Sequence, residues 1–275
     1  MRDPLRAPLD AESLRAMALK PPWHRLDIVT ETGSTNADLV SRAMAGEDID
    51  GAVLIAEHQT RGRGRNGRGW SAIPRAQVLL SVGVATREVP AQLWGWLPLA
   101  AGVAVADAVS AVSGVDASLK WPNDVLVDGG KLAGILAEAV PSQAIVVVGI
   151  GVNVSLRSAE VPDAEIASLL ELGVEAPDRE RLTARLLLDL GVRVAQWRQT
   201  DMGSNLKADY RARSATIGSR VRATLPGGEH VVGLARDVDD HGRLVIEADG
   251  QPVAISAGDV VHLRPADGSP DPKGA

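Results

Sequence analysis

The chain has 275 residues, of which 45% are hydrophobic, and a formal net charge of −6 at pH 7. This length fits one domain of roughly 200 residues with a small second one, and the acidic balance argues against a protein that coats nucleic acid or anionic membranes with its whole surface. Cysteine is absent, which excludes disulfides, thiolate metal sites and cysteine nucleophiles. The apolar stretch 97–112 is interrupted by Asp107, so we expect a buried helix and not a membrane span. With no apolar signal core at the N-terminus, the sequence predicts a soluble, cytoplasmic protein.

Hydrophobic periodicity and turn residues predict the order of the elements. A helix is expected at 11–19, a strand at 25–31, and a helix over 39–45 that starts from the capping-box-like Thr35-x-x-Asp38. Further strands are expected at 52–57, 77–85, 118–120, 124–127, 131–139 and 144–154, further helices at 92–112, 165–172, 178–199 and 206–213, and a loop at 58–70. The turn Asp128-Gly129-Gly130 predicts a hairpin between two of these strands.

The pattern changes near residue 216, after which short β-prone runs alternate with turns such as Pro226-Gly227-Gly228. This pattern indicates a small all-β barrel. Hairpins among the preceding strands favour an α+β fold with a mixed sheet over a doubly wound one. The predicted division is an N-terminal leader at 1–24, a mixed-sheet domain at 25–215, the barrel at 216–264 and a flexible tail at 265–275.

Four arginines and four glycines lie together in the loop QTRGRGRNGRGW at 59–70. Glycines let a backbone approach a ligand closely, and guanidinium groups bind phosphate in a bidentate manner. The loop therefore suits closure over a phosphoryl group. A solvated surface loop and a nucleic-acid-binding arm are the alternatives. The segment is not a P-loop, because no Gly-Lys-Ser/Thr follows.

Four further segments could carry chemistry, and each has a plainer interpretation. The GSTN run at 33–36 opens a helix and could be a simple cap. The KWPND run at 120–124 clusters polar groups beside a hairpin, or Trp121 is a core plug. KLAGILAE at 131–138 has a glycine in mid-strand, which suggests close approach of a ligand or another backbone. GIGVN at 149–153 fails the dinucleotide fingerprint and better suits a strand lining a pocket.

The remaining residue types offer no covalent nucleophile. The five histidines have no metal-ligand spacing, and no Gly-x-Ser-x-Gly elbow is present. Positive charge and flexible glycines instead suit adenylyl or phosphoryl transfer between bound substrates.

Taken together and in this order, GSTN, Gln59 with GRGRNGRGW, KWPND, KLAGIL and GIGVN resemble the biotin protein ligases. The resemblance covers residues 26–153 by motif and extends to about residue 263 by layout, because the family carries a C-terminal SH3-like barrel. It implies a catalytic domain related to class II aminoacyl-tRNA synthetases and a reaction in two steps. The biotin carboxylate attacks the α-phosphate of ATP to give biotinyl-5′-AMP and pyrophosphate, and a carrier lysine then attacks the mixed anhydride and releases AMP.

The resemblance also assigns residues. Those implied for biotin are Ser34, Thr35, Asn36, Gln59, Arg63, Gly64, Arg65, Lys131, Gly134, Gly151 and Asn153. Those implied for ATP or the adenylate are Arg65, Arg68, Trp70, Asn123, Asp124 and Lys131. Lys131, Arg65 and Arg63 would act in catalysis, with Lys131 as the central cation. Mg²⁺ would accompany ATP; no protein motif fixes it, and Asp124 is the candidate side chain near it.

The implied partner is a biotin carboxyl carrier domain of a biotin-dependent carboxylase, with no DNA and no membrane. Only 24 residues precede the first expected strand, too few for the helix-turn-helix of family members that double as repressors, so we expect a ligase without repressor activity. A lipoyl or octanoyl ligase of the same fold is one alternative, and a nucleic-acid-binding regulator using the Arg/Gly loop is another. Arg61 stands where the family usually has a small residue. A weak homodimer stays open.

Overall fold

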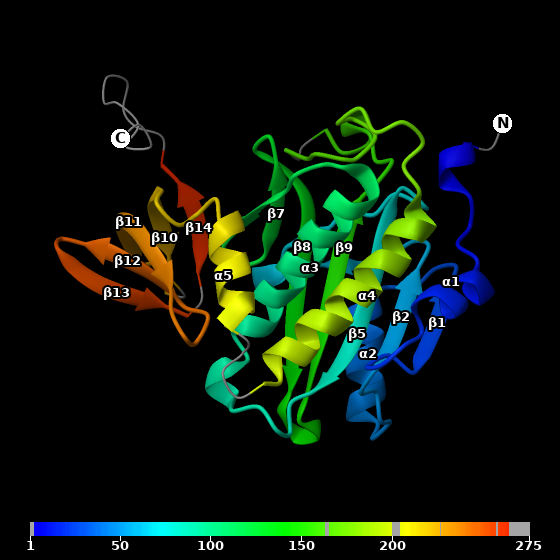
Figure 1. Ribbon diagram of the computed structural model, residues 1–275, viewed down its shortest axis with the longest axis horizontal. Helices are drawn as coiled ribbons and strands as arrows, with labels where there is room; N and C mark the ends of the chain where they lie inside the picture. The colour runs from blue at the N-terminus through cyan, green and yellow to red at the C-terminus, as the bar shows by residue number, and fades with distance from the viewer. Residues whose placement is uncertain (1–2, 163–164, 200–203, 226, 257, 264–275) are drawn as a thin grey trace.

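A computed structural model describes residues 3–162, 165–199, 204–225, 227–256 and 258–263. Its centre is a seven-stranded mixed sheet with the strand order β1-β2-β5-β9-β8-β7-β6 (Figure 1). The strands are β1 (Arg25–Val29), β2 (Ala52–Ala56), β5 (Gln77–Ala85), β6 (Ser118–Lys120), β7 (Asp124–Val127), β8 (Gly130–Val140) and β9 (Ile145–Asn153). β1 and β2 run parallel and all other neighbours antiparallel. The mixed sheet confirms the predicted α+β class.

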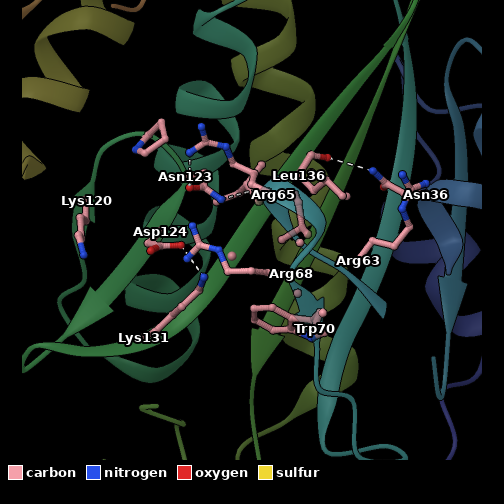
Figure 2. A pocket seen from close by; sticks show the side chains of 18 of the residues that line it. Asn36, Arg63, Arg65, Arg68, Trp70, Lys120, Asn123, Asp124, Lys131 and Leu136 are labelled. Carbon is pink, nitrogen blue, oxygen red and sulfur yellow. Dashed lines mark hydrogen bonds and ion pairs between the residues drawn. The ribbon is translucent and has the colours of Figure 1, made fainter. Parts of the chain in front are cut away.

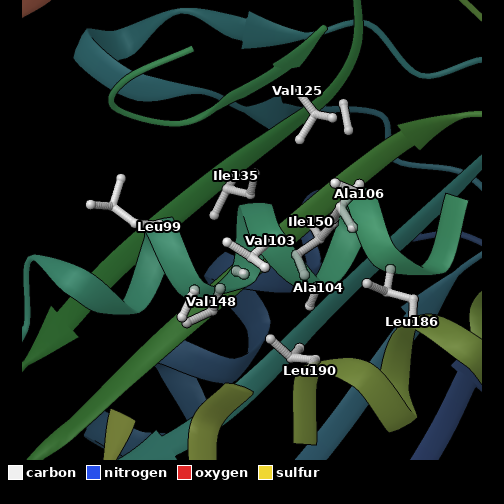
Figure 3. Packing of buried hydrophobic residues seen from close by; sticks show 14 of the residues in the cluster. Leu99, Val103, Ala104, Ala106, Val125, Ile135, Val148, Ile150, Leu186 and Leu190 are labelled. Carbon is white, nitrogen blue, oxygen red and sulfur yellow. The ribbon is translucent and has the colours of Figure 1, made fainter. Parts of the chain in front are cut away.

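Helices cover both faces of this sheet. The α-helices are α1 (Ala11–Ala18), α2 (Thr35–Met44), α3 (Trp96–Ser113), α4 (Arg179–Trp197) and α5 (Ser204–Arg213), and the 3-10 turns are η1 (Pro4–Arg6), η2 (Arg65–Gly67), η3 (Ala91–Leu93), η4 (Pro141–Gln143) and η5 (Ser158–Glu160). α3 and α4 pack together on one face, where Val103, Val148 and Leu190 meet in the main core (Figure 3). α2 packs on the opposite face against Leu54 and Val147.

Helix α3 is apolar on nearly every side. By length and composition alone the segment Ala91–Ser113, with a mean hydropathy of 1.5, could cross a membrane. In the fold the helix lies between the sheet and α4, and side chains on all its sides are buried, including Leu97, Leu99 and Val103. The expectation of a buried helix at 97–112 is confirmed.

A second, antiparallel sheet follows in the order β13-β12-β11-β10-β14. Its strands are β10 (Arg220–Thr224), β11 (His230–Val238), β12 (Leu244–Ala248), β13 (Gln251–Ile255) and β14 (Asp259–His262), and it is the small all-β unit expected from the turn pattern. Two indoles dock it on the first sheet: Trp96 Nε1 donates to the carbonyls of Asp239 and Asp240, and Trp121 Nε1 donates to that of Gly242. The expected tail at 265–275 and the turn residue Pro226 lie outside the described residues.

The N-terminal segment expected as a leader is tied to the first domain through hydrogen bonds to a buried ion pair. Arg179 Nη1 lies 2.6 Å from Glu57 Oε2, and both side chains are almost fully buried. The backbone N–H of Leu9 donates to the same carboxylate, and Arg179 Nη2 donates to the carbonyl of Ala7. Burial of the pair and these added hydrogen bonds make this segment part of the folded unit.

Three sequence expectations were wrong. Residues 165–172 do not form a helix, because their backbone groups bond to the sheet instead: Ala167 N–H donates to Lys131 O, and Leu170 N–H to Val154 O. The 58–70 loop contains a small hairpin, β3 (Gly62–Arg63) paired with β4 (Gly69–Trp70). Helix α2 begins one residue earlier than the capping pattern indicated, since Ser34 is the N-cap and its hydroxyl accepts from Ala37 N–H.

Candidate active site

A pocket of about 260 Å³ lies where the start of α2, the β3–β4 hairpin, the 120–124 turn, strands β8 and β9, and strand β14 meet (Figure 2). Most of the residues expected from the sequence line it. They are Ser34, Thr35, Asn36, Gln59, Arg63, Gly64, Arg65, Arg68, Trp70, Asn123, Asp124, Lys131, Gly134 and Gly151. Segments that are far apart in the sequence therefore form one cavity.

One end of the pocket is a hydrogen-bonded group of four buried side chains, which we call the buried network: Thr35, Asn36, Gln59 and Ser81. Gln59 Oε1 accepts from the backbone N–H of Thr35 at 2.7 Å and from its hydroxyl at 3.0 Å. The hydroxyls of Thr35 and Ser81 lie 2.7 Å apart, and Ser81 donates to Asn36 Oδ1 at 2.6 Å. Such a network holds its donors and acceptors in fixed directions.

The local sequence explains why this network can form. Ser34 caps α2, so Thr35 and Asn36 lie in the first turn and face the sheet. Asn36 packs directly on β9, where a Cβ on Gly149 would overlap its side-chain amide. The Asn36 amide nitrogen also donates to Leu136 O at 3.1 Å and to Glu138 Oε2 at 2.9 Å, which joins α2 to β8.

The floor of the pocket is made by two glycines on neighbouring strands. Gly134 of β8 pairs with Gly151 of β9, and the indole of Trp70 lies over both. A Cβ would be 2.8 Å from the Trp70 ring at Gly134 and 2.6 Å from it at Gly151, so neither position has room for a side chain. Trp70 Nε1 is buried without a hydrogen-bond partner, and Lys131 Nζ lies 5.5 Å from the ring centroid.

Three ion pairs, which we call the charged mouth, complete the site: Lys131–Asp124 and Arg68–Asp259 lie at the other end, and Arg63–Glu138 lies beside Asn36 (Figure 2). Lys131 Nζ lies 2.5 Å from Asp124 Oδ1, and Arg63 Nη2 lies 2.8 Å from Glu138 Oε1. Arg68 pairs with Asp259 of the second sheet. The side chains of these pairs are between 23% and 63% exposed, so solvent screens them.

Arg65 lies between the two ends, and none of the described carboxylates is within ion-pair distance of it. Its guanidinium donates to Asn123 Oδ1 at 3.2 Å and to the carbonyl of Gly258 at 3.3 Å. Burial lowers the pKa of Arg65, while the nearby Asp259 and Asp124 partly offset this. The group stays a cation at neutral pH, so the pocket keeps a positive charge that a bound anion could neutralise.

Asn153 is the one expected site residue that does not line the pocket. It is almost fully buried behind β8, where its amide nitrogen donates to Lys131 O at 3.1 Å and to Ala167 O at 3.0 Å. Its oxygen accepts from Gln77 at 2.9 Å. Asn153 therefore fixes the backbone that carries Lys131. Arg61 also stays outside the cavity, against Gly33.

Sequence reasoning missed several lining residues. The lining residues that it did not assign to the site are Gly69, Leu80, Lys120, Trp121, Pro122, Ile135, Leu136, Gly149, Ile150, Asp259, Val260 and Val261. Those at 120–122, 135–136 and 149–150 belong to segments that were singled out, so alternation along the strands could have identified some of them. Nothing in the sequence links the last three to the site, because they come from β14. Trp121 lines the pocket and is also a buried plug.

Within the described ranges, no group of three or more His, Cys, Asp or Glu side chains could hold a metal ion. The pocket does contain the carboxylate of Asp124, whose Oδ1 is paired with Lys131 Nζ. A lone carboxylate of this kind fits Mg²⁺ that arrives with a nucleotide, because Mg²⁺ commonly binds one or two carboxylates together with substrate phosphates.

Comparison with known proteins gives two family matches. Residues 32–155 match the biotin/lipoate A/B protein ligase family, and residues 216–263 match the biotin protein ligase C terminal domain. The biotin--[acetyl-CoA-carboxylase] ligase of Mycobacterium tuberculosis is 59% identical over 268 residues, which is 96% of this chain and 99% of that protein. The bifunctional ligase/repressor BirA of Escherichia coli is 32% identical over 79% of this chain and 67% of its own length.

Solved structures agree with the sequence matches. The biotin protein ligase from Aquifex aeolicus in complex with biotin and ATP superimposes with a TM-score of 0.75 at 25% identity, over 88% of this chain and 100% of that one. Both family matches fall on the two sheets described above, and the first of them covers most of the pocket-lining segments. The chain belongs to the biotin protein ligase family.

Proposed function

We propose that the protein is an ATP-dependent biotin protein ligase that makes biotinyl-5′-AMP and transfers biotin to a lysine of a biotin carboxyl carrier domain. The observation that carries the proposal is the single pocket in which a buried network of neutral polar groups lies beside a cluster of cations. Biotin has the matching two parts: a neutral, polar ureido ring and a charged carboxylate. The relative that is 59% identical has the same activity in its name.

In the first step two anions must meet, and this requires fixed positive charge. Two like charges 4 Å apart repel by about 4 kcal/mol in the environment of a protein surface. Lys131 would neutralise the biotin carboxylate and then the α-phosphate, after exchanging its pairing with Asp124. The carboxylate oxygen forms a bond to the α-phosphorus as the bond to the pyrophosphate oxygen breaks, and Arg63 and Arg65 would stabilise the charge that develops.

The end of the pocket formed by the buried network would bind the ureido ring, with Thr35, Asn36 and Gln59 of the network and the neighbouring Ser34 as the contacts. These side chains are 9% exposed or less, so each unpaired polar group there would be costly. A lipoyl or octanoyl tail has no ureido group and would offer these polar side chains no hydrogen-bonding partner in the ligand. The site therefore favours biotin over the lipoyl alternative, and discrimination of this kind can be large.

The nucleotide would lie at the charged mouth, where Arg68, Trp70, Asn123 and Asp124 line the cavity. Asp124, with Asn123 beside it, would hold Mg²⁺ that comes with ATP, and the ion would neutralise phosphate charge. Gly134 and Gly151 would form the floor under the bound intermediate, and Gly64 would let the hairpin approach it.

The second step needs a closed pocket, because the mixed anhydride is readily hydrolysed. The β3–β4 hairpin already lies over the cavity and would exclude water. The carrier lysine, as the free amine, attacks the biotinyl carbonyl carbon and AMP leaves with the bonding electrons. We further propose that residues 25–215 form the catalytic domain and residues 216–264 the barrel. We also propose a cytoplasmic location, which the absence of cysteine fits. No DNA or membrane partner is part of the proposal.

The test is exchange of labelled pyrophosphate into ATP, measured with Mg²⁺ and with biotin, with lipoate or with neither. Exchange that depends on biotin supports the adenylation step, and subsequent labelling of a carrier domain supports the transfer. Exchange that depends on lipoate would mean that the substrate of this fold is lipoate and not biotin. A folded sample that exchanges with neither compound would contradict the proposal, and a salt-sensitive shift of DNA in a gel would support the regulator instead.

A further inference from the structure

The second sheet reaches into the pocket at one place, the start of β14. Three contacts join residues 258–259 to the tip of the β3–β4 hairpin. Asp259 pairs with Arg68 and accepts a hydrogen bond from Asn66 Nδ2 at 3.3 Å, and the carbonyl of Gly258 accepts from Arg65 at 3.3 Å. Of the three ion pairs in the charged mouth, the Arg68–Asp259 pair is the one that connects the hairpin to the second sheet.

The hairpin cannot hold this position by itself. Each of its strands has two residues, and two-stranded hairpins are at best marginally stable in water. At its tip, Asn66 and Gly67 are exposed and have left-handed backbone angles, with φ of 53° and 72°, and a Cβ on Gly67 would meet nothing within 4 Å. Arg65 and Arg68 flank this tip, so the contacts to β14 act on the residues that cover the pocket.

Strand β14 is a rigid support. Asp259 is in register with Thr224 of β10, and Val260 beside it is buried in the main hydrophobic cluster. Gly258 lies so close to β10 that a Cβ there would be 2.8 Å from the carbonyl of Thr224. The second sheet is in turn fixed to the first by the Trp96 and Trp121 hydrogen bonds.

We propose that Asp259 is a positioning residue that holds the β3–β4 hairpin closed over the pocket, so that the C-terminal barrel helps to retain the adenylate. The carboxylate keeps Arg68 over the cavity before any phosphate is bound, and Asn66 holds the tip beside it. The retention part rests on the proposed function, whereas the closure part does not.

Closure is tested first, without substrates. Trypsin cuts after arginine, and the hairpin with the residue before it contains four possible sites: Arg61, Arg63, Arg65 and Arg68. Asp259→Ala removes both contacts of the side chain, while Asp259→Asn keeps its shape and removes its charge. We expect cleavage within 61–68, identified by fragment mass, to be severalfold faster in Asp259→Ala and intermediate in Asp259→Asn. Glu247→Gln is the matched control, because it breaks an exposed arginine pair on the same sheet away from the pocket.

A double-variant comparison separates the contact from a general loosening of the barrel. Asn66→Ala alone should raise the cleavage rate less than Asp259→Ala, and the double variant should be no faster than Asp259→Ala, since both changes remove the same hydrogen bond. Additive effects would contradict a direct contact. The melting temperature of each variant, compared with that of Glu247→Gln, reports whether the barrel is still folded.

Retention is tested next, by the rate at which labelled biotinyl-AMP leaves the protein and by labelling of lysines on a bystander protein. We expect Asp259→Ala to release the adenylate severalfold faster, with Arg65→Gly as the positive control for leakage. Wild-type rates of both cleavage and release in a folded Asp259→Ala variant would overturn the proposal. If the wild-type protein forms no adenylate, the proposed function fails, and the cleavage rates still decide the role of Asp259.

Discussion

The two ends of the pocket are formed by different kinds of side chain. In the buried network, Thr35, Asn36 and Ser81 are no more than 3% exposed and bond to one another through neutral groups. In the charged mouth the side chains of Arg68 and Asp259 are 63% and 43% exposed, and every group is an ion. Neutral buried bonds are costly to break, whereas exposed ion pairs contribute little and exchange partners readily.

This difference matches what each end has to do in the proposed reaction. The ureido ring of biotin stays in one place and keeps its hydrogen bonds through both steps, so a fixed network suits it. The carboxylate and the phosphates change charge, and pyrophosphate must leave, so their partners have to be able to move. The carboxylates of Asp124, Glu138 and Asp259 would hold the cations in the pocket until substrate anions replace them.

The largest effect is expected at the centre of the charged mouth. Lys131→Ala should lower biotin-dependent pyrophosphate exchange by about 10²–10³-fold, the loss typical for a group that stabilises charge in the transition state. The fold should survive, because the Lys131 side chain is 35% exposed and its backbone bonds do not depend on it. A melting curve controls for folding. Near-normal exchange in a folded variant would contradict the role of Lys131.

The next effect tests the buried network. Ser81→Ala leaves Asn36 Oδ1 and the Thr35 hydroxyl without this partner, at a cost of about 1–3 kcal/mol. We expect biotin binding to weaken by about tenfold to a hundredfold and the melting temperature to fall, both measurable by titration calorimetry and thermal denaturation. Thr86→Val is the matched control, because that buried hydroxyl has no hydrogen-bond partner. Equal effects of the two variants would mean that the network does not orient biotin.

The sequence predicted the fold where local pattern decides it. Strand 77–85 has the same bounds as β5, and Asp128-Gly129-Gly130 forms the expected turn between β7 and β8. The pattern failed at 165–172, where apolar residues at helical spacing, such as Ile166, Leu169 and Leu170, belong to a segment whose backbone bonds to the sheet. Hydrogen bonds of this kind are tertiary, so propensity cannot reveal them.

The candidate site shows the same limit. The motifs identified the arginines, the glycines and Lys131 of the pocket, because these residues stand in short contiguous segments whose composition is recognisable in the sequence. Asp259 could not be found this way, since its partner Asn66 is 193 positions away and an isolated Asp before a valine run indicates nothing. Asn153 was expected in the pocket because it ends a motif, yet it does not line the cavity and instead bonds to the backbone of Lys131.

A smaller effect is expected at the glycine floor between the two ends. Gly151→Ala places a Cβ 2.6 Å from the Trp70 ring, and overpacking of this kind costs about 1–3 kcal/mol. Since the indole faces an open cavity, it can turn aside, and we expect the exchange rate to fall by about tenfold with little loss of stability. Gly102→Ala is the control, because its Cβ would meet Leu119 at 3.4 Å. Unchanged exchange would show that the position of Trp70 is not needed.

The smallest effect is expected at an exposed ion pair far from the pocket, and it tests the assumption that such pairs contribute little. Hydrogen bonds from Arg42, and secondarily from Arg25, lower the pKa of Glu47 from 4.5 to about 2. Because the folded-state pKa is depressed, the stabilisation is complete above pH 4.5 and is lost as the pH falls from 4.5 toward 2. Solvent screens the cluster, since the Arg25 and Glu47 side chains are 50% and 37% exposed, so the contribution is at most about 1 kcal/mol.

Glu47→Gln should therefore lower the melting temperature by a few degrees at most at pH 6, and the difference from the wild type should shrink as the pH falls to 3. Addition of 1 M salt, for which the Debye length is about 3 Å, should also reduce the difference. If Glu47→Gln lost more stability than Ser81→Ala, the order of buried hydrogen bonds and exposed ion pairs would be reversed. Exposed ion pairs would then be strong supports in this protein, and the charged mouth could not exchange its partners as readily as the two-step reaction requires.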